Sequence, residues 1–212
     1  MTGFPFKPAK AVAHLKAADP ALAAIIDTVG PFRMELKQSR SLFGALAEAI
    51  VYQQLSNKAA ATIYGRVEAL YPDAPDGFTP RHILKTPDEA LRGCGLSRAK
   101  VLAVQDLARR VEEGELPTLD VAQDIPDSEL IERLVTVRGI GRWSAEMFLM
   151  FRLGRPDVLP LDDYSLRNAY AKAFRKRVLP SPKELEKAGQ KWRPYRTVAS
   201  WYLWRVLDLP SA

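Results

Sequence analysis

Cysteine, histidine and long apolar runs are all scarce in this chain, and each scarcity narrows what the protein can be. Its 212 residues include one cysteine, Cys94, and two histidines. A single cysteine excludes an internal disulfide and any cysteine-ligated zinc or iron–sulfur centre. No run approaches the roughly 18 apolar residues of a membrane span, and the first ten residues lack a signal-peptide core. We therefore expect a cytoplasmic protein with no membrane partner.

Strand patterns are also missing, because no segment sustains an alternation of β-branched and polar residues. Apolar residues instead recur at helical spacing over 39–56 and 98–114. The stretches "TPDE" (86–89) and "SPKE" (181–184) each predict a capping box at a helix start, and Asp19-Pro20 is a similar start. These signals predict an all-α protein of about ten short helices.

Positive charge is present in excess, but only in the last third of the chain. Residues 138–212 carry 15 Lys and Arg against 7 Asp and Glu, whereas residues 1–137 carry 16 against 18. This asymmetry favours a polyanion-binding face, although a solvated basic surface would have the same composition.

The most informative segment is "LVTVRGIGRWSAEMFLMF" (134–151), in which two glycines interrupt a helical pattern. Gly139 and Gly141 allow positive φ and a close approach of the backbone to another molecule. The helix that follows begins with unpaired N–H groups, which form an anion site, and Arg138 and Arg142 flank them. A DNA phosphate fits this arrangement, while an isolated G-x-G would indicate only a turn between two helices.

Five motifs resemble one known family. "VRGIGRWSAEMF" (137–148) resembles the helix-hairpin-helix of the base-excision DNA glycosylase superfamily (HhH-GPD), and "LGRPDVLPLDDYSLRNAYAKAF" (153–174) resembles the loop and aspartate that follow it. "AIVYQQLSNKAAATIYGRV" (49–67), "LRGCGLSRAKVLAVQDLA" (91–108) and "KWRPYRTVASWYLWRV" (191–206) are similar to the 3-methyladenine DNA glycosylase II branch, which repairs alkylation damage. The resemblance covers about residues 40–207 in the family's order.

The resemblance implies two helical subdomains with a DNA-binding cleft between them. We expect one subdomain from residues 1–40 with 175–212, and a helical bundle over 41–174 with the hairpin at 129–152. Larger enzymes of this branch carry an additional N-terminal α/β domain, for which we expect no room in 212 residues.

The family's activity is hydrolysis of the N-glycosidic bond of a damaged base, which must first be flipped out of the duplex. In this chain the phosphate anchor would be Arg138, Gly139, Ile140, Gly141 and Arg142, with Arg98 and Lys100 as further phosphate candidates. The residue inserted into the gap would be Gln54 or Leu55, and the sequence leaves this choice open. The base pocket would use Trp143, Trp204, Met147 and Trp201, although aromatics at helical spacing are usually core residues.

The carboxylate that stabilises the oxocarbenium-like sugar would be Asp163 or Asp162. Counting from Gly141, the alkylation branch places its aspartate at Asp163. Matching on Arg167, as in the oxidative-damage branch, favours Asp162. We choose Asp163 as catalytic and expect Asp162 to cap the helix over 163–174 or to assist.

Relatives with lyase activity carry a lysine at the position of Trp143, so a monofunctional enzyme of the DNA-3-methyladenine glycosylase II type is predicted. The resemblance implies no required cofactor and no iron–sulfur cluster, with a structural Na⁺ or K⁺ on the main-chain carbonyls of Val135 and Val137. It further implies a monomer acting on double-stranded DNA that contains damaged bases, located with the bacterial nucleoid or in a eukaryotic nucleus. The alternatives are a non-catalytic helix-hairpin-helix DNA-binding protein and a helix-turn-helix regulator, for which we see no recognition helix.

Overall fold

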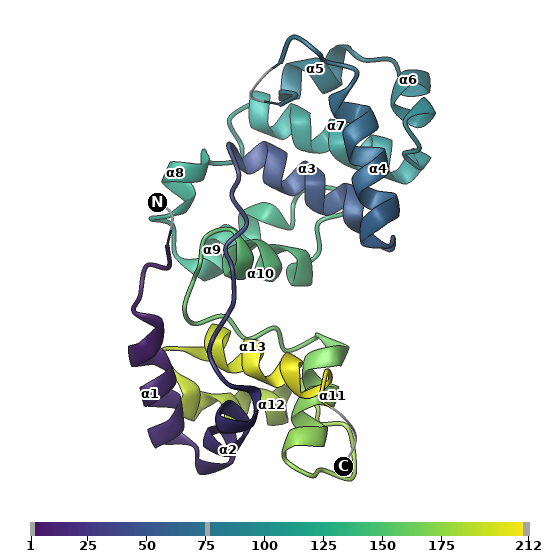
Figure 1. The fold of residues 1–212 in the computed structure, drawn as a ribbon. Coiled ribbons are helices and arrows are strands. Elements are labelled where there is room, and N and C mark those ends of the chain that lie inside the picture. The colour runs from purple at the N-terminus through teal and green to yellow at the C-terminus, as the bar shows by residue number, and fades with distance from the viewer. Residues whose placement is uncertain (1–2, 75–76, 210–212) are drawn as a thin grey trace. The chain divides into compact units, whose positions relative to one another are not determined.

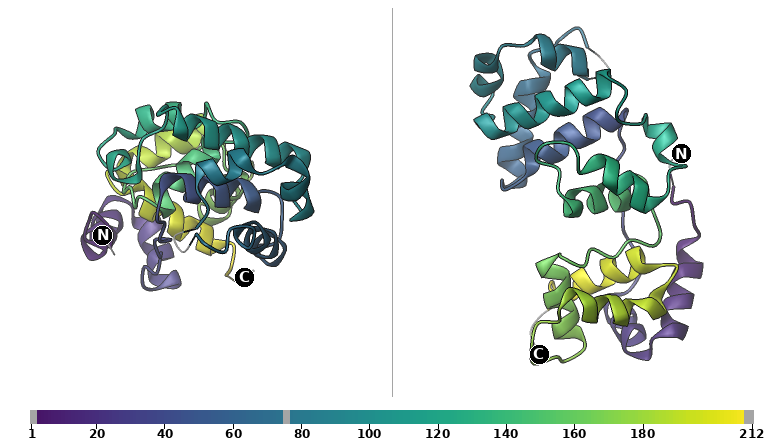
Figure 2. Two further views of the ribbon diagram at one scale, coloured as in Figure 1. Left: turned by 90° about the horizontal axis from the view of Figure 1, so that it is seen from above. Right: turned by 180° about the vertical axis from the view of Figure 1, so that it is seen from behind.

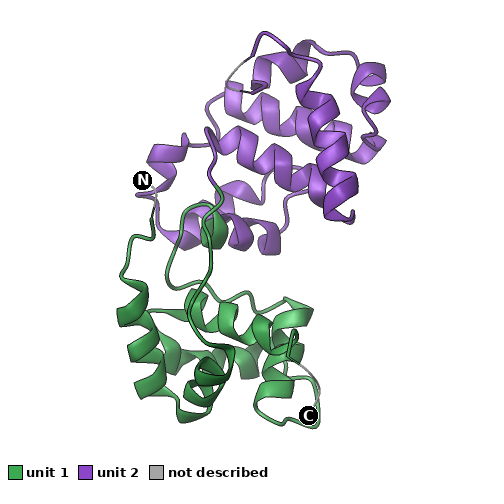
Figure 3. Cartoon of the chain, in the orientation of Figure 1, with its two compact units in different colours: residues 1–37, 149–212 green, residues 38–148 purple. Residues whose placement is uncertain are grey.

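The computed structural model describes residues 3–74 and 77–209, and these residues contain helices and no strand. This confirms the predicted all-α class. The chain forms two compact units, one of residues 1–37 with 149–212 (unit 1) and one of residues 38–148 (unit 2), coloured separately in Figure 3. None of the described helices is long and apolar enough to cross a membrane.

Unit 2 is built around a long amphipathic helix, α7, which packs against α3 and α5 (Figures 1 and 2). Its buried residues recur every three or four positions, and Ser97 caps its first turn by accepting the Lys100 N–H. The helices of this unit are α3 (Leu42–Tyr52), α4 (Asn57–Glu68), α5 (Pro80–Lys85), α6 (Asp88–Gly93), α7 (Arg98–Glu112), α8 (Leu119–Ala122) and α9 (Asp127–Leu134).

Unit 1 joins the two ends of the chain. Helix α13 packs against both α2 and α11, so residues far apart in sequence share one core (Figure 1). Trp192 and Tyr202 are fully buried there. The helices are α1 (Pro8–Ala18), α2 (Pro20–Val29), α11 (Tyr164–Ala173), α12 (Pro182–Gly189), the 3₁₀ turn η1 (Gln190–Trp192) and α13 (Arg196–Val206), while α10 (Arg142–Phe151) contains the division between the units.

This division differs from the boundary expected at residues 40 and 174, because residues 149–174 group with the chain ends. The physical reason is that α11 packs against α13 and α12. In addition, the Lys37 N–H donates to the Phe151 carbonyl at 2.9 Å, which joins the N-terminal arm to the end of α10.

Two of the three predicted helix starts are confirmed. Ser181 and Glu184 form a reciprocal capping box at α12, and Asp19 caps α2. The capping box expected at Thr86 is wrong, because α6 begins after Pro87 with no side-chain cap. The Thr86 hydroxyl instead donates to the His82 carbonyl at 2.8 Å, so it serves the end of the preceding helix α5.

Candidate active site

The hairpin between α9 and α10 occupies residues 135–141 and turns at Gly139, where φ is +80°. The Ile140 N–H donates to the Val137 carbonyl at 3.0 Å and closes the turn. The first helical bond of α10 runs from the Ala145 N–H to the Gly141 carbonyl at 3.1 Å. Amides that precede this bond, including those of Gly141 and Arg142, have no acceptor within the helix, which is the geometry of an anion site.

Only one of the two glycines adopts the positive φ that both residues allow. Gly139 is left-handed, whereas Gly141 is not among the residues with positive φ. A side chain at Gly139 would also lie 3.3 Å from the Cβ of Ala103 on α7, while a side chain at Gly141 would meet nothing within 4 Å. Gly139 is therefore required by the fold, and Gly141 leaves open space beside the backbone.

We expect Gly139→Ala to lower the free energy of unfolding by about 1–2 kcal/mol, because alanine is strained at this φ. Gly141→Ala is the matched control, with an expected change within about 0.5 kcal/mol. Urea unfolding of both variants would measure the difference, and equal losses would contradict the assignment.

An aspartate that the sequence analysis missed holds the hairpin in place. The Arg138 N–H donates to Asp106 Oδ2 at 2.9 Å, and Asp106 also pairs with Arg109 and Arg110 at 3.0 Å each. Burial by itself would raise the pKa of Asp106, but the hydrogen bonds from Arg138 and Arg110 outweigh it and hold the pKa below its usual value. The spacing of Asp106 to Arg109 and Arg110 is a sequence signal for local ion pairs, but no local signal points to the contact with the Arg138 amide.

These contacts narrow the predicted phosphate anchor. The amides of Arg138 and Ile140 are bonded within the protein, and the Ile140 side chain is buried. The exposed groups that remain are the backbone at Gly139 and Gly141 and the two arginine side chains. Arg142 pairs with Glu146 at 3.1 Å but keeps 65% of its side chain exposed. Ile140 is thus a core contact rather than a phosphate ligand.

The turn between α3 and α4 carries both wedge candidates at the surface. Gln54 is one of two described non-glycine residues with positive φ, at +58°. Leu55 is one of the exposed large apolar residues, with 38% of its surface accessible. The turn lies close to the hairpin, since Gln53 Nε2 donates to the Gly139 carbonyl at 2.9 Å. We will call residues 53–56 the wedge turn.

Lys100 does not have the environment of a phosphate ligand. Its ammonium group donates to the carbonyls of Val51 at 2.7 Å and Gln53 at 2.9 Å, at the end of α3. Burial lowers the pKa of Lys100 below its usual value. Arg98, at the first position of α7, is exposed and fits a phosphate contact.

Trp143 and Met147 lie one turn apart on α10 in unit 2. Trp143 is 47% exposed, which is unusual for a core tryptophan, and Met147 is half-buried. Both side chains reach the surface, and their role in a base pocket stays a prediction.

The candidate carboxylate in unit 1 is held by two donors. Asp163 is the N-cap of α11, where Oδ1 accepts the Leu166 N–H, and the same oxygen lies 3.4 Å from Trp204 Nε1. Asp162, expected as cap or helper, is exposed and does not cap the helix. The cap prediction is therefore wrong for Asp162, because the helix begins one residue later than 163.

The loop before Asp163 is tied to the start of α13. Arg196 binds the Asp157 carboxylate at 2.7 Å, and the buried Thr197 hydroxyl bonds both the Arg155 carbonyl at 2.6 Å and the Val158 N–H at 3.0 Å. The same helix carries Trp204, which stacks on Phe151 with 6.2 Å between ring centroids. The contacts between residues 155–158 and the start of α13 thus help to position both the Asp163 carboxylate and the Trp204 indole. The sequence did not predict these contacts.

Trp201, predicted for the base pocket, is mostly buried in unit 1. It is only 8% exposed and packs edge-on against Phe32 at 4.9 Å and Tyr202 at 4.9 Å. One turn of α13 thus separates a core tryptophan from the half-buried Trp204.

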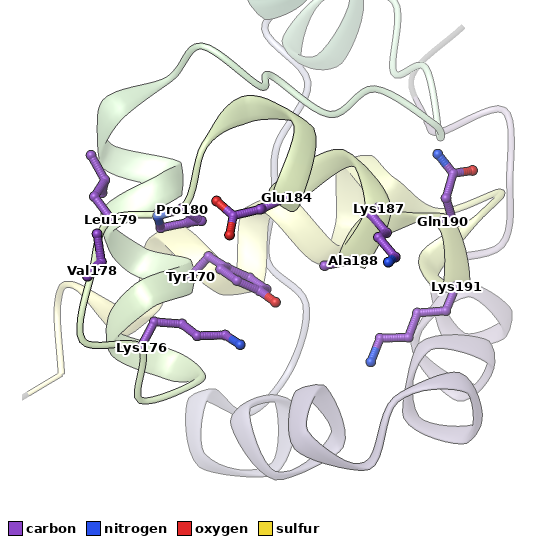
Figure 4. A pocket seen from close by; sticks show the side chains of 10 residues that line it. All are labelled: Tyr170, Lys176, Val178, Leu179, Pro180, Glu184, Lys187, Ala188, Gln190 and Lys191. Carbon is purple, nitrogen blue, oxygen red and sulfur yellow. The ribbon is translucent and has the colours of Figure 1, made fainter.

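No side-chain metal site is present in residues 3–74 and 77–209, where His, Cys, Asp and Glu form no cluster of three or more. A cavity of about 580 Å³ in unit 1 lies between α11 and α12 and is lined by Tyr170, Glu184 and three lysines among others (Figure 4). It contains none of the predicted site residues.

The chain is similar to known proteins over most of its length. Residues 47–194 match the model of the HhH-GPD superfamily base excision DNA repair proteins. DNA-3-methyladenine glycosylase 1 of Schizosaccharomyces pombe is 36% identical over 204 residues, covering 94% of this chain and 88% of the relative.

Two solved structures are similar over most of the chain. The 3-methyladenine DNA glycosylase of S. pombe in complex with abasic DNA superimposes with a TM-score of 0.82, 35% identity and coverage of 94% of this chain and 97% of that one. The DNA-3-methyladenine glycosidase of Bacillus halodurans gives a TM-score of 0.83 and 36% identity, with coverage of 92% and 88%.

The hairpin and the following aspartate define a DNA-repair fold of the helix-hairpin-helix class, and the chain belongs to the HhH-GPD superfamily of base excision DNA repair proteins. Within that superfamily its place is the 3-methyladenine DNA glycosylase branch.

Proposed function

We propose that this protein is a monofunctional DNA glycosylase that removes alkylated purines, such as 3-methyladenine, from double-stranded DNA. The observation that carries the proposal is Asp163, a carboxylate 3.4 Å from the indole N–H of Trp204, in a chain of the 3-methyladenine glycosylase branch. A DNA-binding module would need the hairpin but neither of these two side chains.

The hairpin would bind the DNA backbone. The exposed backbone at Gly139 and Gly141 and the side chains of Arg138, Arg142 and Arg98 offer donors and positive charge to phosphates. Gln54 or Leu55 would then fill the gap that the flipped nucleotide leaves. The anchor and the wedge lie in unit 2, and the proposed carboxylate lies in unit 1.

Asp163 would stabilise the positive charge that develops on the sugar as the glycosidic bond breaks. The electron pair of the C1′–N bond leaves with the base, the oxygen of a water molecule bonds to C1′, and the carboxylate accepts the water's proton. A base alkylated at a ring nitrogen is cationic and departs as a neutral molecule, so no acid is needed to protonate it.

Trp143 and Met147 on α10 would contact the flipped base. An indole face attracts a cationic purine by roughly 0.5–2 kcal/mol beyond ordinary stacking. Trp143 stands where the bifunctional relatives carry a lysine, so an amine for a Schiff base is missing from this position.

The test is release of methylated purines from alkylated duplex DNA under single-turnover conditions. We expect free base, an abasic strand that breaks only after alkali, and no covalent complex after borohydride treatment. A protein that binds the same DNA tightly but releases no base would be a non-catalytic helix-hairpin-helix module, and a borohydride-trapped complex would identify a lyase.

The main-chain carbonyls of Val135 and Val137 would bind the proposed monovalent cation. Both residues come after Leu134, the last residue of α9. The Val137 carbonyl accepts the Ile140 N–H at 3.0 Å and keeps a second lone pair that could bind a cation. We propose Na⁺ or K⁺ there, where it would add positive charge beside the phosphate anchor. We also propose that the protein acts as a monomer on nucleoid or nuclear DNA.

A further inference from the structure

Three segments of unit 2 are joined by side-chain hydrogen bonds that the proposed roles do not explain. Lys100 on α7 donates to the Val51 and Gln53 carbonyls, and Gln53 Nε2 donates to the Gly139 carbonyl at 2.9 Å and to Ser144 Oγ at 3.4 Å. Six residues beyond Lys100 on the same helix, Asp106 accepts the Arg138 N–H. Helix α7 therefore contacts both the wedge turn and the hairpin.

Lys100 occupies a position that favours a structural role. The last carbonyls of a helix receive no hydrogen bond from an N–H group of the same helix. In addition, the negative end of the helix dipole attracts a cation. Lys100 supplies both a charge and two donors at the end of α3, with contacts of 2.7 and 2.9 Å. A lysine that donates twice into its own fold has little capacity left for a phosphate.

The contact is made at a strained point of the backbone. The Gln53 carbonyl belongs to the peptide group that leads into Gln54, whose φ of +58° is unusual for a residue with a side chain. Such conformations are unfavourable for residues with a side chain and persist where the surrounding structure holds them. Lys100 holds this peptide from one side, and the Gln53 side chain ties the same residue to the hairpin.

We propose that Lys100 and Gln53 are positioning residues that hold the wedge turn at a set distance from the phosphate anchor, so that Gln54 or Leu55 is aimed into the duplex before the nucleotide leaves the stack. This inference rests on the proposed glycosylase function, and it replaces the role of phosphate ligand that we had predicted for Lys100.

The salt dependence of DNA binding separates the two roles of Lys100. The binding constant for DNA falls as salt rises, and each phosphate contact contributes about −0.9 to the slope of log K against log salt. Removing a phosphate contact therefore makes this slope less steep by about 0.9, whereas removing a positioning contact leaves it unchanged. We expect Lys100→Met to keep the native slope on undamaged duplex and to slow single-turnover base release by about 10–100-fold, since small misplacements near reacting groups have effects of this size. Arg138→Met is the matched control and should make the slope less steep.

Two further variants complete the test. Lys100→Arg keeps the charge and the donors and should recover much of the rate, and Gln53→Met removes the link to the hairpin without changing charge. Thermal unfolding of each variant shows whether it is folded, and Gln53→Met tests the inference if Lys100→Met is not. If Lys100→Met made the slope of log K against log salt less steep and left the rate of base release unchanged at saturating protein, the inference would be overturned.

Failure of the proposed function can be recognised separately. Insertion of the wedge is measured without chemistry by the fluorescence of 2-aminopurine opposite a tetrahydrofuran abasic site. A native protein that changes this fluorescence but releases no base would refute the glycosylase proposal alone. If the native protein and Lys100→Met change the fluorescence equally, the positioning role is wrong.

Discussion

Replacing Asp163 by asparagine is expected to slow single-turnover release of 3-methyladenine by 100-fold or more, with DNA affinity retained. A factor of 100 corresponds to roughly 3 kcal/mol of lost transition-state stabilisation, which is typical of removing one aligned charge or donor. The asparagine amide cannot stabilise a developing cation as a carboxylate does, and it cannot accept a proton from water.

Asparagine is the informative substitution because Asp163 also caps α11. Asparagine is as good an N-cap as aspartate, so Asp163→Asn keeps the bond from the Leu166 N–H and an acceptor toward Trp204. Alanine would remove the cap and lower stability by about 1 kcal/mol, which would mix a folding defect with the loss of chemistry.

Asp162→Asn is the control, because Asp162 is adjacent, exposed and does not cap the helix. It should retain nearly native rates. Normal release by Asp163→Asn together with slow release by Asp162→Asn would transfer the catalytic role to Asp162.

The largest effect on stability is expected for Asp19→Ala, about 3 kcal/mol. Asp19 caps α2, and its carboxylate also accepts the indole N–H of the fully buried Trp192 at 2.8 Å and pairs with Lys191 at 2.9 Å. Alanine would remove a cap of about 1 kcal/mol and leave a buried donor unpaired at about 1–3 kcal/mol. Urea unfolding with an unchanged m-value would measure the loss.

Asp27→Ala is the matched control, since Asp27 forms an ion pair with Lys16 in which its side chain is 65% exposed. Exposed pairs contribute about 0–1 kcal/mol, so this variant should remain close to native. Losses of similar size in the two variants would show that Asp19 is not a special contact.

Asp19 should also make stability depend on pH. Burial by itself would raise its pKa, but the hydrogen bonds from Trp192 and Lys191 outweigh this and hold the pKa below its usual value. A carboxyl with a lowered folded pKa stabilises the protein above its unfolded pKa of about 3.9, and this stability is lost as the pH falls through the folded pKa. Asp19→Asn should therefore flatten the decline in unfolding free energy below about pH 4, and an identical decline would contradict this cause.

Local signals in the sequence predicted the helices well. The starts of α2, α7 and α12 follow from cap residues beside proline or apolar periodicity, which act within one turn of the chain. Thr86 shows the limit of such signals. The hydroxyl that would have capped α6 bonds the His82 carbonyl and lies 2.6 Å from the Tyr71 hydroxyl, and the second of these partners is 15 residues away.

By itself, the sequence determined the helical class, the hairpin around Gly139 and the position of Asp163 after it, because these depend on local backbone preferences and on the order of motifs. Only the tertiary structure decided which donors and acceptors are used. It assigned the Arg138 amide to Asp106, the Lys100 ammonium to the end of α3 and Trp201 to the core. The physical reason is that each partner comes from a distant segment, and a side chain's type states what it can bond but not what the fold brings within reach.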